Sequence, residues 1–305
     1  MYGGGSSEEY LGRLNWQGRG IIMDTKLSPR KKALIPGART YTHKAADLRP
    51  ALLQSLKALN TDKVSQNDHL LTVFIFENVA DTTKVDMWYL HAPDHDTPYE
   101  ETLREVNNLY QEGYFKRFGI SNYAAWEVAQ ICELCKANGW KKPDAYQGVY
   151  NALHRAVEPE LFPCLRFYGI AFYEFNPLAG GFLTDRYQRN TAEHEEGSRF
   201  DPARNQGQSY RGKYWNDVYF DALDIIRPAA KKLGLTTAEA AVRWVNHHSL
   251  MKREHGDAII IGASSAQQLE ENLTNLEKGP LPDELVKAFD EGWAIVKGSC
   301  KPYYH

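Results

Sequence analysis

Apolar residues in this chain follow two alternating patterns: short apolar runs, and longer stretches with apolar positions three and four residues apart. The runs predict strands and the stretches predict amphipathic helices. Six strands are predicted, at residues 20–27, 85–91, 115–122, 145–151, 170–176 and 258–262. Helical spacing appears in Leu52, Leu56 and Leu59, in Leu103, Val106 and Tyr110, and in Leu269, Leu273 and Leu276. Strands that alternate with helices are typical of a mainly parallel sheet, and hence of the α/β class.

Further helices are predicted at residues 6–14, after Pro282, and in two pieces between residues 219 and 248. Gly234 breaks the last region, and Thr236 or Thr237 is expected to cap its second helix. Residues 199–215 are expected to form a loop that shapes a pocket. Two basic residues of this loop, Arg211 and Lys213, either recognise a carboxylate or simply face solvent.

The segment from Val64 to Lys84 does not fit the alternation. It contains the apolar run 70–76, a strong strand former, yet it separates a helix from a strand that a loop of roughly 2 to 6 residues would join. The dipeptide Lys-Val occurs at both of its ends, and removing residues 64–84 leaves a connection of ordinary length. We therefore predict an insertion at 64–84. The chain also opens directly in a turn, so we expect further elements to belong ahead of Met1.

Composition narrows the class of protein. The chain has 305 residues, of which 43% are hydrophobic, enough to bury the core of a single α/β domain. A net charge of -3 does not indicate a positively charged surface for binding nucleic acid or an anionic membrane. No apolar run reaches the ~18 residues of a membrane span, and no signal peptide is recognisable. We expect a soluble, cytoplasmic protein that acts on a small molecule.

The cysteines predict no metal or redox centre. There are four, and only Cys132 and Cys135 are close in sequence. They share helical spacing with Val128 and Ile131, which favours buried thiols on a helix face over a zinc site, because no second pair completes a ligand set. Cys164 and Cys300 carry no pattern. Few cysteines are typical of a reducing compartment.

Polar side chains stand where two predicted strands end. His91 closes the strand 85–91, and Ser121 and Asn122 close the strand 115–122. In barrels of alternating strands and helices, catalytic groups sit at the C-terminal ends of the strands. The Gly180-Gly181 pair fits neither the dinucleotide-binding nor the P-loop glycine pattern. The chain is therefore expected to be an enzyme built on parallel strands, without a Rossmann or P-loop motif.

Five motifs, in order along the chain, resemble those of the aldo-keto reductases, and most closely the aflatoxin aldehyde reductases. They are VDMWYLHAPDH (85–95), GISNY (119–123), YQGVYN (146–151), NPLAGG (176–181) and GASS (262–265). The resemblance covers nearly the whole chain apart from 64–84. It implies a (β/α)8 TIM barrel that reduces aldehydes and ketones to alcohols with NADPH. Residues 1–305 would form one such domain, lacking the first strand and helix and most of the second strand.

The resemblance also implies three catalytic residues. Tyr2 matches the proton donor, Lys26 the lysine that ends the third barrel strand, and His91 the histidine that ends the fourth. A phenol is a reluctant donor, and a nearby ammonium lowers its pKa toward the working pH. His91 would hydrogen-bond the carbonyl oxygen. The family's Asp, which pairs with the lysine, would lie upstream of Met1. Without it we expect Lys26 to lose its position and part of its charged population, and the chain as given to reduce aldehydes poorly.

NADP(H) positions carry over in the same way. Ser121, Asn122 and Gln147 match side chains that hold the nicotinamide carboxamide, and Phe175 matches the aromatic residue that stacks on the nicotinamide ring. The remaining positions match the diphosphate and the adenosine 2′-phosphate: Asn176, Pro177, Leu178, Gly180, Leu183, Arg186 and Arg199 on the first, and Gly262, Ser264, Gln268, Glu271 and Asn272 on the second. A helix N-terminus after the last strand would also attract the anion.

Other interpretations stay open. Taken singly, His91 reads as a buried core histidine, Lys26 as a surface lysine and Tyr2 as a fraying terminal residue. A regulatory or catalytically impaired NADP(H)-binding protein on the same scaffold is the alternative function, and a poorly folding truncated product is a third. His247 and His248 carry no spacing typical of a metal site. A homodimer follows from the resemblance alone.

Overall fold

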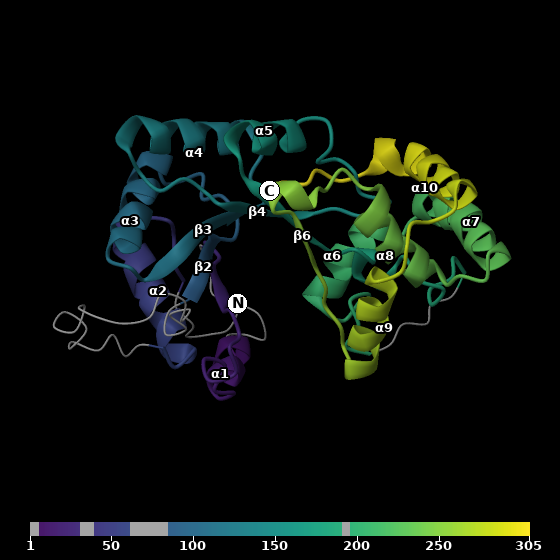
Figure 1. Ribbon diagram of the computed structural model, residues 1–305, viewed down its shortest axis with the longest axis horizontal. Coiled ribbons are helices and arrows are strands. Elements are labelled where there is room, and N and C mark those ends of the chain that lie inside the picture. The colour runs from purple at the N-terminus through teal and green to yellow at the C-terminus, as the bar shows by residue number, and fades with distance from the viewer. Residues whose placement is uncertain (1–5, 31–39, 62–84, 191–195) are drawn as a thin grey trace. The chain divides into compact units, whose positions relative to one another are not determined.

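The computed structural model of the chain describes residues 6–30, 40–61, 85–190 and 196–305 (Figure 1). The six predicted strands are all confirmed. They are β1 Asp24–Leu27, β2 Val85–Leu90, β3 Phe115–Ser121, β4 Ala145–Val149, β5 Ala171–Phe175 and β6 Ala258–Ile260. Along the sheet they follow one another in chain order. The pairs β1–β2, β2–β3 and β5–β6 are parallel, as the alternation with helices predicts.

The chain divides into two compact units, residues 1–146 with 304–305, and residues 147–303. Three sequence predictions fall outside the described residues: the catalytic Tyr2, the insertion 64–84 and the elements expected ahead of Met1. Each unit is described by itself below.

In its described residues, the first unit holds β1 to β3 and four helices, α1 Ser6–Gly12, α2 Ala45–Ala58, α3 Tyr99–Gln111 and α4 Ala125–Asn138. Most of the apolar positions that predicted α2 and α3 are buried, among them Leu52, Val106 and Leu103, whereas Tyr110 is half-buried. Burial of such a face is what stabilises a helix of this length, since its intrinsic propensity is weak. Cys132 and Cys135 are buried on α4, as their spacing predicts.

The N-terminal end of this unit is anchored on α2. The indole Nε1 of Trp16, itself 1% exposed, donates to the carbonyl of Leu59 over 2.9 Å. Gly12 lies so close to the same helix that a Cβ there would stand 2.2 Å from the carbonyl oxygen of Ala58. Only glycine permits this approach, so α1 and the turn after it pack directly on the end of α2.

The second unit holds β5, β6 and most of the helices: α5 Leu161–Tyr168, α6 Asn205–Tyr214, α7 Asp217–Lys232, α8 Thr237–His248, α9 Ala266–Leu276 and α10 Asp283–Val296. Short 3-10 turns lie at Ala179–Gly181, Arg253–His255 and Lys297–Ser299. The predicted break between α7 and α8 is confirmed. Gly234 has a φ of 71°, and the Thr236 side chain accepts from the Glu239 amide over 3.1 Å. The helix after Pro282 is confirmed as α10.

Two parts of the second unit differ from the sequence prediction. Residues 205–214, expected to be a loop, form α6, which buries only Gly207 and Tyr214. So few buried positions leave no amphipathic period to read, and tertiary contacts hold this helix instead. The helix α9 is confirmed, but Leu269 and Leu273 on its apolar face are 41% and 48% exposed.

Among the residues that the structure describes, no helix combines the length and apolar character needed to cross a membrane.

Candidate active site

One row of residues crosses the three strands of the first unit. Lys26 on β1 pairs in register with Tyr89 on β2, which pairs with Gly119 on β3. The amino group of Lys26 stands 5.6 Å from the centre of the Tyr89 ring. A Cβ at Gly119 would lie 2.3 Å from that ring, so the buried ring occupies the volume left by the missing side chain. This row places Lys26 one residue before the end of β1.

The charge of Lys26 is sensitive to its surroundings. Burial lowers the pKa of Lys26 to about 8, and the carboxylate of Asp24 opposes this shift. Asp24 stands two residues earlier on the same strand, and its carboxyl accepts from the Met87 amide over 3.1 Å. Burial and the neighbouring Asp86 raise the pKa of Asp24 to about 6. The carboxylate predicted for Lys26 is expected upstream of Met1, whereas Asp24, two residues earlier on β1, lies on the same face of the strand as Lys26.

His91 directly follows β2. Its backbone amide donates to the carbonyl of Leu27 over 2.8 Å, and its own carbonyl accepts from the Asn122 side chain over 2.7 Å. Burial first, and the positive charge of Lys26 second, lower the pKa of His91 to about 4. The imidazole is therefore neutral near pH 7, a state in which one ring nitrogen donates a hydrogen bond.

Ser121 and Asn122 close β3 beside His91. Both are buried, and the Asn122 amide also donates to the Ser121 hydroxyl over 3.0 Å. Asn122 has a φ of 64°, a left-handed conformation that asparagine tolerates better than most residues. The backbone amide of His305 donates to the Asn122 carbonyl over 3.1 Å. No sequence motif marks this contact of the C-terminal residue, and it was not predicted.

The turn after β5 begins the other group of predicted residues, in the second unit. Phe175 ends the strand, and Asn176 follows with a φ of 79°. The Asn176 side chain donates to the Tyr214 hydroxyl over 3.1 Å, and its carbonyl accepts from the Asn151 side chain over the same distance. Gly180 has a φ of 70°, which glycine adopts without steric cost. The turn is thus both sharply bent and held by side chains.

The rest of this loop is anchored on the helices that follow. Two predicted residues, Pro177 and Leu183, are buried, whereas Arg186 is exposed. The Arg227 guanidinium donates to the carbonyl of Thr184 over 2.6 Å and to that of Tyr187 over 2.7 Å. The Asp185 carboxylate accepts from the amide and hydroxyl of Thr237, at the start of α8. Leu178 stays half-buried, and its carbonyl accepts from the Leu183 amide over 3.1 Å.

The residues predicted to bind the adenosine end gather at the start of α9. Ser265 caps the helix by accepting from the Gln268 amide over 3.2 Å. The Gln268 side chain in turn accepts from the amide and the hydroxyl of Ser264, over 3.1 and 2.8 Å. Gly262, Ser264 and Glu271 are exposed, and Asn272 is buried. An exposed helix N-terminus with hydroxyl and amide groups has the donors that a phosphate requires.

The two basic residues of α6 are packed. The Arg211 side chain donates to the Phe200 carbonyl over 2.6 Å and lies 4.3 Å from the Trp215 ring. Lys213 is half-buried, which lowers its pKa. The Arg211 side chain thus makes its contacts within the second unit. The prediction that Arg211 or Lys213 recognises a carboxylate stays a prediction.

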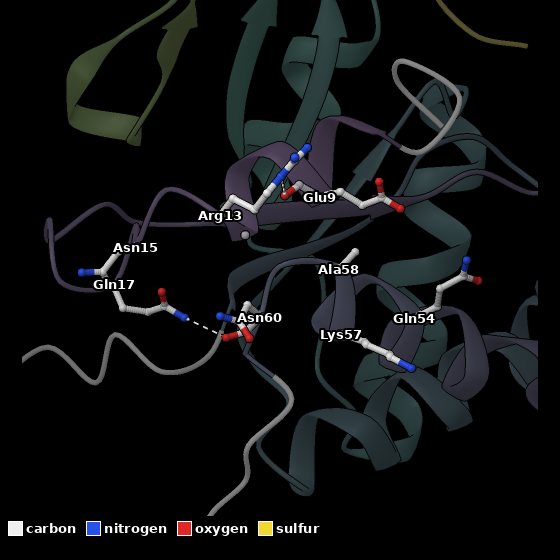
Figure 2. A pocket seen from close by; sticks show the side chains of 9 residues that line it. Glu9, Arg13, Asn15, Gln17, Gln54, Lys57, Ala58 and Asn60 are labelled. Atoms are coloured by element: carbon white, nitrogen blue, oxygen red, sulfur yellow. Dashed lines mark hydrogen bonds between the residues drawn. The ribbon is translucent and has the colours of Figure 1, made fainter.

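A surface hollow of about 790 Å³ lies between α1 and α2 (Figure 2). Its lining mixes charged and amide side chains, including Glu9, Arg13 and Lys57. The Gln17 side chain donates to the Asn60 carbonyl across part of it, over 3.4 Å. None of the predicted site residues that the structure describes lines this hollow, and we assign it no role. The described residues also contain no group of three or more His, Cys, Asp or Glu able to hold a metal ion.

The predicted residues that the structure describes lie in both units. Lys26, His91, Ser121 and Asn122 gather at the ends of β1, β2 and β3. Phe175, the turn after it and Arg199 lie in the second unit, with the start of α9 and Gln147, which is buried on β4. A neutral imidazole and an ammonium suit a carbonyl group, and arginine with a helix N-terminus suits phosphates.

Comparisons with known proteins agree with this geometry. A sequence profile described as the aldo/keto reductase family matches residues 78–294. An aldo-keto reductase of Pseudocercospora fijiensis is 58% identical over 304 residues, covering 100% of this chain and 94% of that protein. The aldo-keto reductase pigE of Monascus ruber is 50% identical over 308 residues, covering 100% and 84%. Aflatoxin B1 aldehyde reductase member 2 of Mus musculus is 47% identical over 225 residues, covering 72% and 61%.

The resemblance read from the five motifs is thus confirmed. Members of the matched family are (β/α)8 barrels and oxidoreductases that act on small carbonyl compounds, and the parallel strands and intervening helices described above are of that α/β class. By its matched profile and by relatives that align with its full length, the chain belongs to the aldo/keto reductase family.

Proposed function

We propose that this protein is an NADPH-dependent reductase of aldehydes and ketones, with chemistry similar to that of the aflatoxin aldehyde reductases. One observation carries the proposal. A lysine whose pKa is lowered to about 8 and a histidine whose pKa is lowered to about 4 stand at the ends of neighbouring parallel strands, at Lys26 and His91. Shifted groups of this kind cluster at catalytic sites.

The residues of this chain would divide the work as follows. Bound NADPH supplies the hydride that reduces the carbonyl carbon. The neutral imidazole of His91 donates a hydrogen bond to the carbonyl oxygen and orients it. Tyr2 gives that oxygen its proton, and the Lys26 ammonium lowers the phenol pKa from its free value near 10. Ser121, Asn122 and Gln147 hold the carboxamide, and Phe175 stacks on the nicotinamide ring.

The preference for NADPH over NADH rests on the start of α9. Ser264 and Gln268 present hydroxyl and amide groups at a helix N-terminus, which suits the extra 2′-phosphate of NADPH. Fluorescence titration of the protein with both reduced cofactors tests the preference, and we expect NADPH to bind at least about tenfold more tightly, a difference of one phosphate held by charge-assisted hydrogen bonds. Equal affinities would contradict it.

Activity is tested by NADPH consumption with 4-nitrobenzaldehyde or succinic semialdehyde. Tyr2→Phe, Lys26→Met and His91→Phe should each lower kcat/KM by roughly 10² or more, the range of general acid catalysis. Lys57→Met is the matched control, because Lys57 lies on the surface hollow beside α1. Tight NADPH binding without any turnover would instead favour a regulatory NADP(H)-binding protein.

We further propose that the protein acts in the cytoplasm. Its four cysteines are free thiols in the structure. Free thiols fit a reducing compartment. Localisation of a fluorescent fusion in cells checks this.

A further inference from the structure

One residue of α6 contacts both segments that are expected to hold the cofactor diphosphate. The Tyr210 hydroxyl lies 3.5 Å from the Asn176 side-chain oxygen, in the turn after β5. An Arg199 nitrogen lies 3.4 Å from the same hydroxyl, and the guanidinium carbon is 5.5 Å from the centre of the ring. Asn176 and Arg199 are 23 residues apart in sequence, and Tyr210 joins them.

The Tyr210 ring also sits directly on Gly180. A Cβ at position 180 would lie 2.3 Å from one ring carbon and 2.5 Å from the next. Gly180 has a φ of 70° besides. The absence of a side chain therefore serves two ends here, since it allows the left-handed turn and makes room for the aromatic ring. The Tyr210 ring therefore covers Gly180 in this turn.

The position of Tyr210 is fixed by the helix that carries it. Tyr214, one turn later on α6, accepts from the Asn176 side chain over 3.1 Å, and its ring stacks on Phe182 at 21° with centres 6.0 Å apart. At the start of the helix, Gly207 lies against the backbone of Asp201. These contacts at both ends of α6 hold Tyr210, in the middle of the helix, in place.

We propose that Tyr210 is a positioning residue for the cofactor diphosphate, an inference that rests on the proposed function. Its ring keeps the turn 176–181 in its bent form and presents the Arg199 guanidinium beside that turn. Arginine over an aromatic face is held by the ring's negative potential, and this leaves its N–H groups free to meet an anion. The hydroxyl contacts are long for hydrogen bonds, so the ring does most of the holding.

The test compares NADPH affinity and steady-state kinetics of the full chain and its variants. Tyr210→Leu removes the ring and should weaken NADPH binding about 5- to 30-fold, whereas Tyr210→Phe keeps the ring and should stay within about 3-fold. Tyr187→Phe is the matched control, since Tyr187 packs in the neighbouring aromatic cluster against Phe200 and Trp215. If Tyr210→Leu folds poorly, Tyr210→Met replaces it, because methionine adapts to irregular gaps.

A second comparison separates positioning from general stability. With Tyr210→Leu, the KM for NADPH should rise, while kcat at saturating NADPH stays within about 2-fold, because the reacting groups lie elsewhere. Arg199→Met should lose affinity in the normal protein and lose much less in the Tyr210→Leu background, since the ring no longer presents the guanidinium.

Two results would overturn the inference. One is equal NADPH affinity for Tyr210→Leu and the unaltered protein; the other is full additivity of the Arg199 and Tyr210 substitutions. A failure of the proposed function looks different, because then the unaltered protein binds neither NADPH nor NADH, and this inference falls with it.

Discussion

The ring of Tyr89 lies against the backbone of Gly119, at a distance that leaves no room for a methyl group. A Cβ at Gly119 would stand 2.3 Å from the ring. The same ring lies beside the Lys26 amino group, 5.6 Å from its centre. A glycine in the third strand therefore determines where a tyrosine in the second strand packs, and that tyrosine borders the lysine on which the proposed chemistry depends.

The first prediction concerns this contact. Gly119→Ala should lower the free energy of unfolding by roughly 1–3 kcal/mol, because the added methyl overpacks a buried site. Displacement of Tyr89 should also lower kcat more than it raises the KM for NADPH. Chemical denaturation and steady-state kinetics measure the two effects. Gly279→Ala is the control, because a Cβ there meets open space; if both variants behave alike, the ring does not depend on Gly119.

The pH dependence of activity should follow the charge of Lys26. Its pKa is lowered to about 8, so the ammonium is present below that pH and is lost as the pH rises through it. The pKa of His91 is lowered to about 4, so the imidazole stays neutral down to that value. Log kcat/KM should therefore be level between about pH 5 and 7 and fall above about 8.

Lys26→Arg separates this explanation from ionisation of another group. The guanidinium stays charged throughout the range, so any activity that remains should decline only at higher pH. An alkaline decline at an unchanged pH in this variant would show that Lys26 is not the group that titrates.

Much of the fold is readable from the sequence because burial dictates the pattern. Leu52 stands at helical spacing from Leu56 in α2, and Val106 at helical spacing from Leu103 in α3. Both Leu52 and Val106 are fully buried. Gly234 and Thr236 mark a helix break by backbone chemistry that is local to them, and the structure confirms it. Local rules suffice where neighbours in sequence decide the conformation.

Tertiary contacts decide the parts that could not be predicted. The helix α6 has few apolar positions, and it forms where Gly207 meets Asp201 and Tyr210 covers Gly180. The lowered pKa of Lys26 depends on burial, and the contact of His305 with Asn122 joins residues 183 apart. The catalytic Tyr2, which the resemblance implies, lies outside the described residues.

The predicted insertion gives a direct experiment. If residues 64–84 are extraneous, their deletion should raise soluble yield and leave or raise the melting temperature, because the run 70–76 is apolar and prone to form strands between chains. Removal of the 13 residues of α3 is the control and should destroy the fold. A deletion variant with a lower melting temperature would show that the segment belongs to the core.

The last prediction concerns Glu174, a carboxylic acid buried in β5. Its side chain is 0% exposed, and neither carboxyl oxygen has a hydrogen-bond partner among the residues that the structure describes. Burial raises the pKa of Glu174 well above its ordinary value of 4.5. The folded protein therefore keeps this carboxyl protonated at pH values where the unfolded chain has lost the proton. Because the folded state then binds more protons, stability must fall as the pH rises above about 4.5.

Glu174→Met should remove this cost. We expect it to raise the free energy of unfolding by roughly 1–3 kcal/mol at pH 8, the penalty of an unsatisfied buried polar group, and by less at pH 5. Glu174→Gln removes the titration but keeps a polar group, so it should flatten the pH dependence without the full gain. Urea denaturation at pH 5 and pH 8 measures both, with Glu277→Met as the exposed control. Equal stabilisation by Glu174→Met at the two pH values would mean that Glu174 keeps the same protonation state in the folded and unfolded protein.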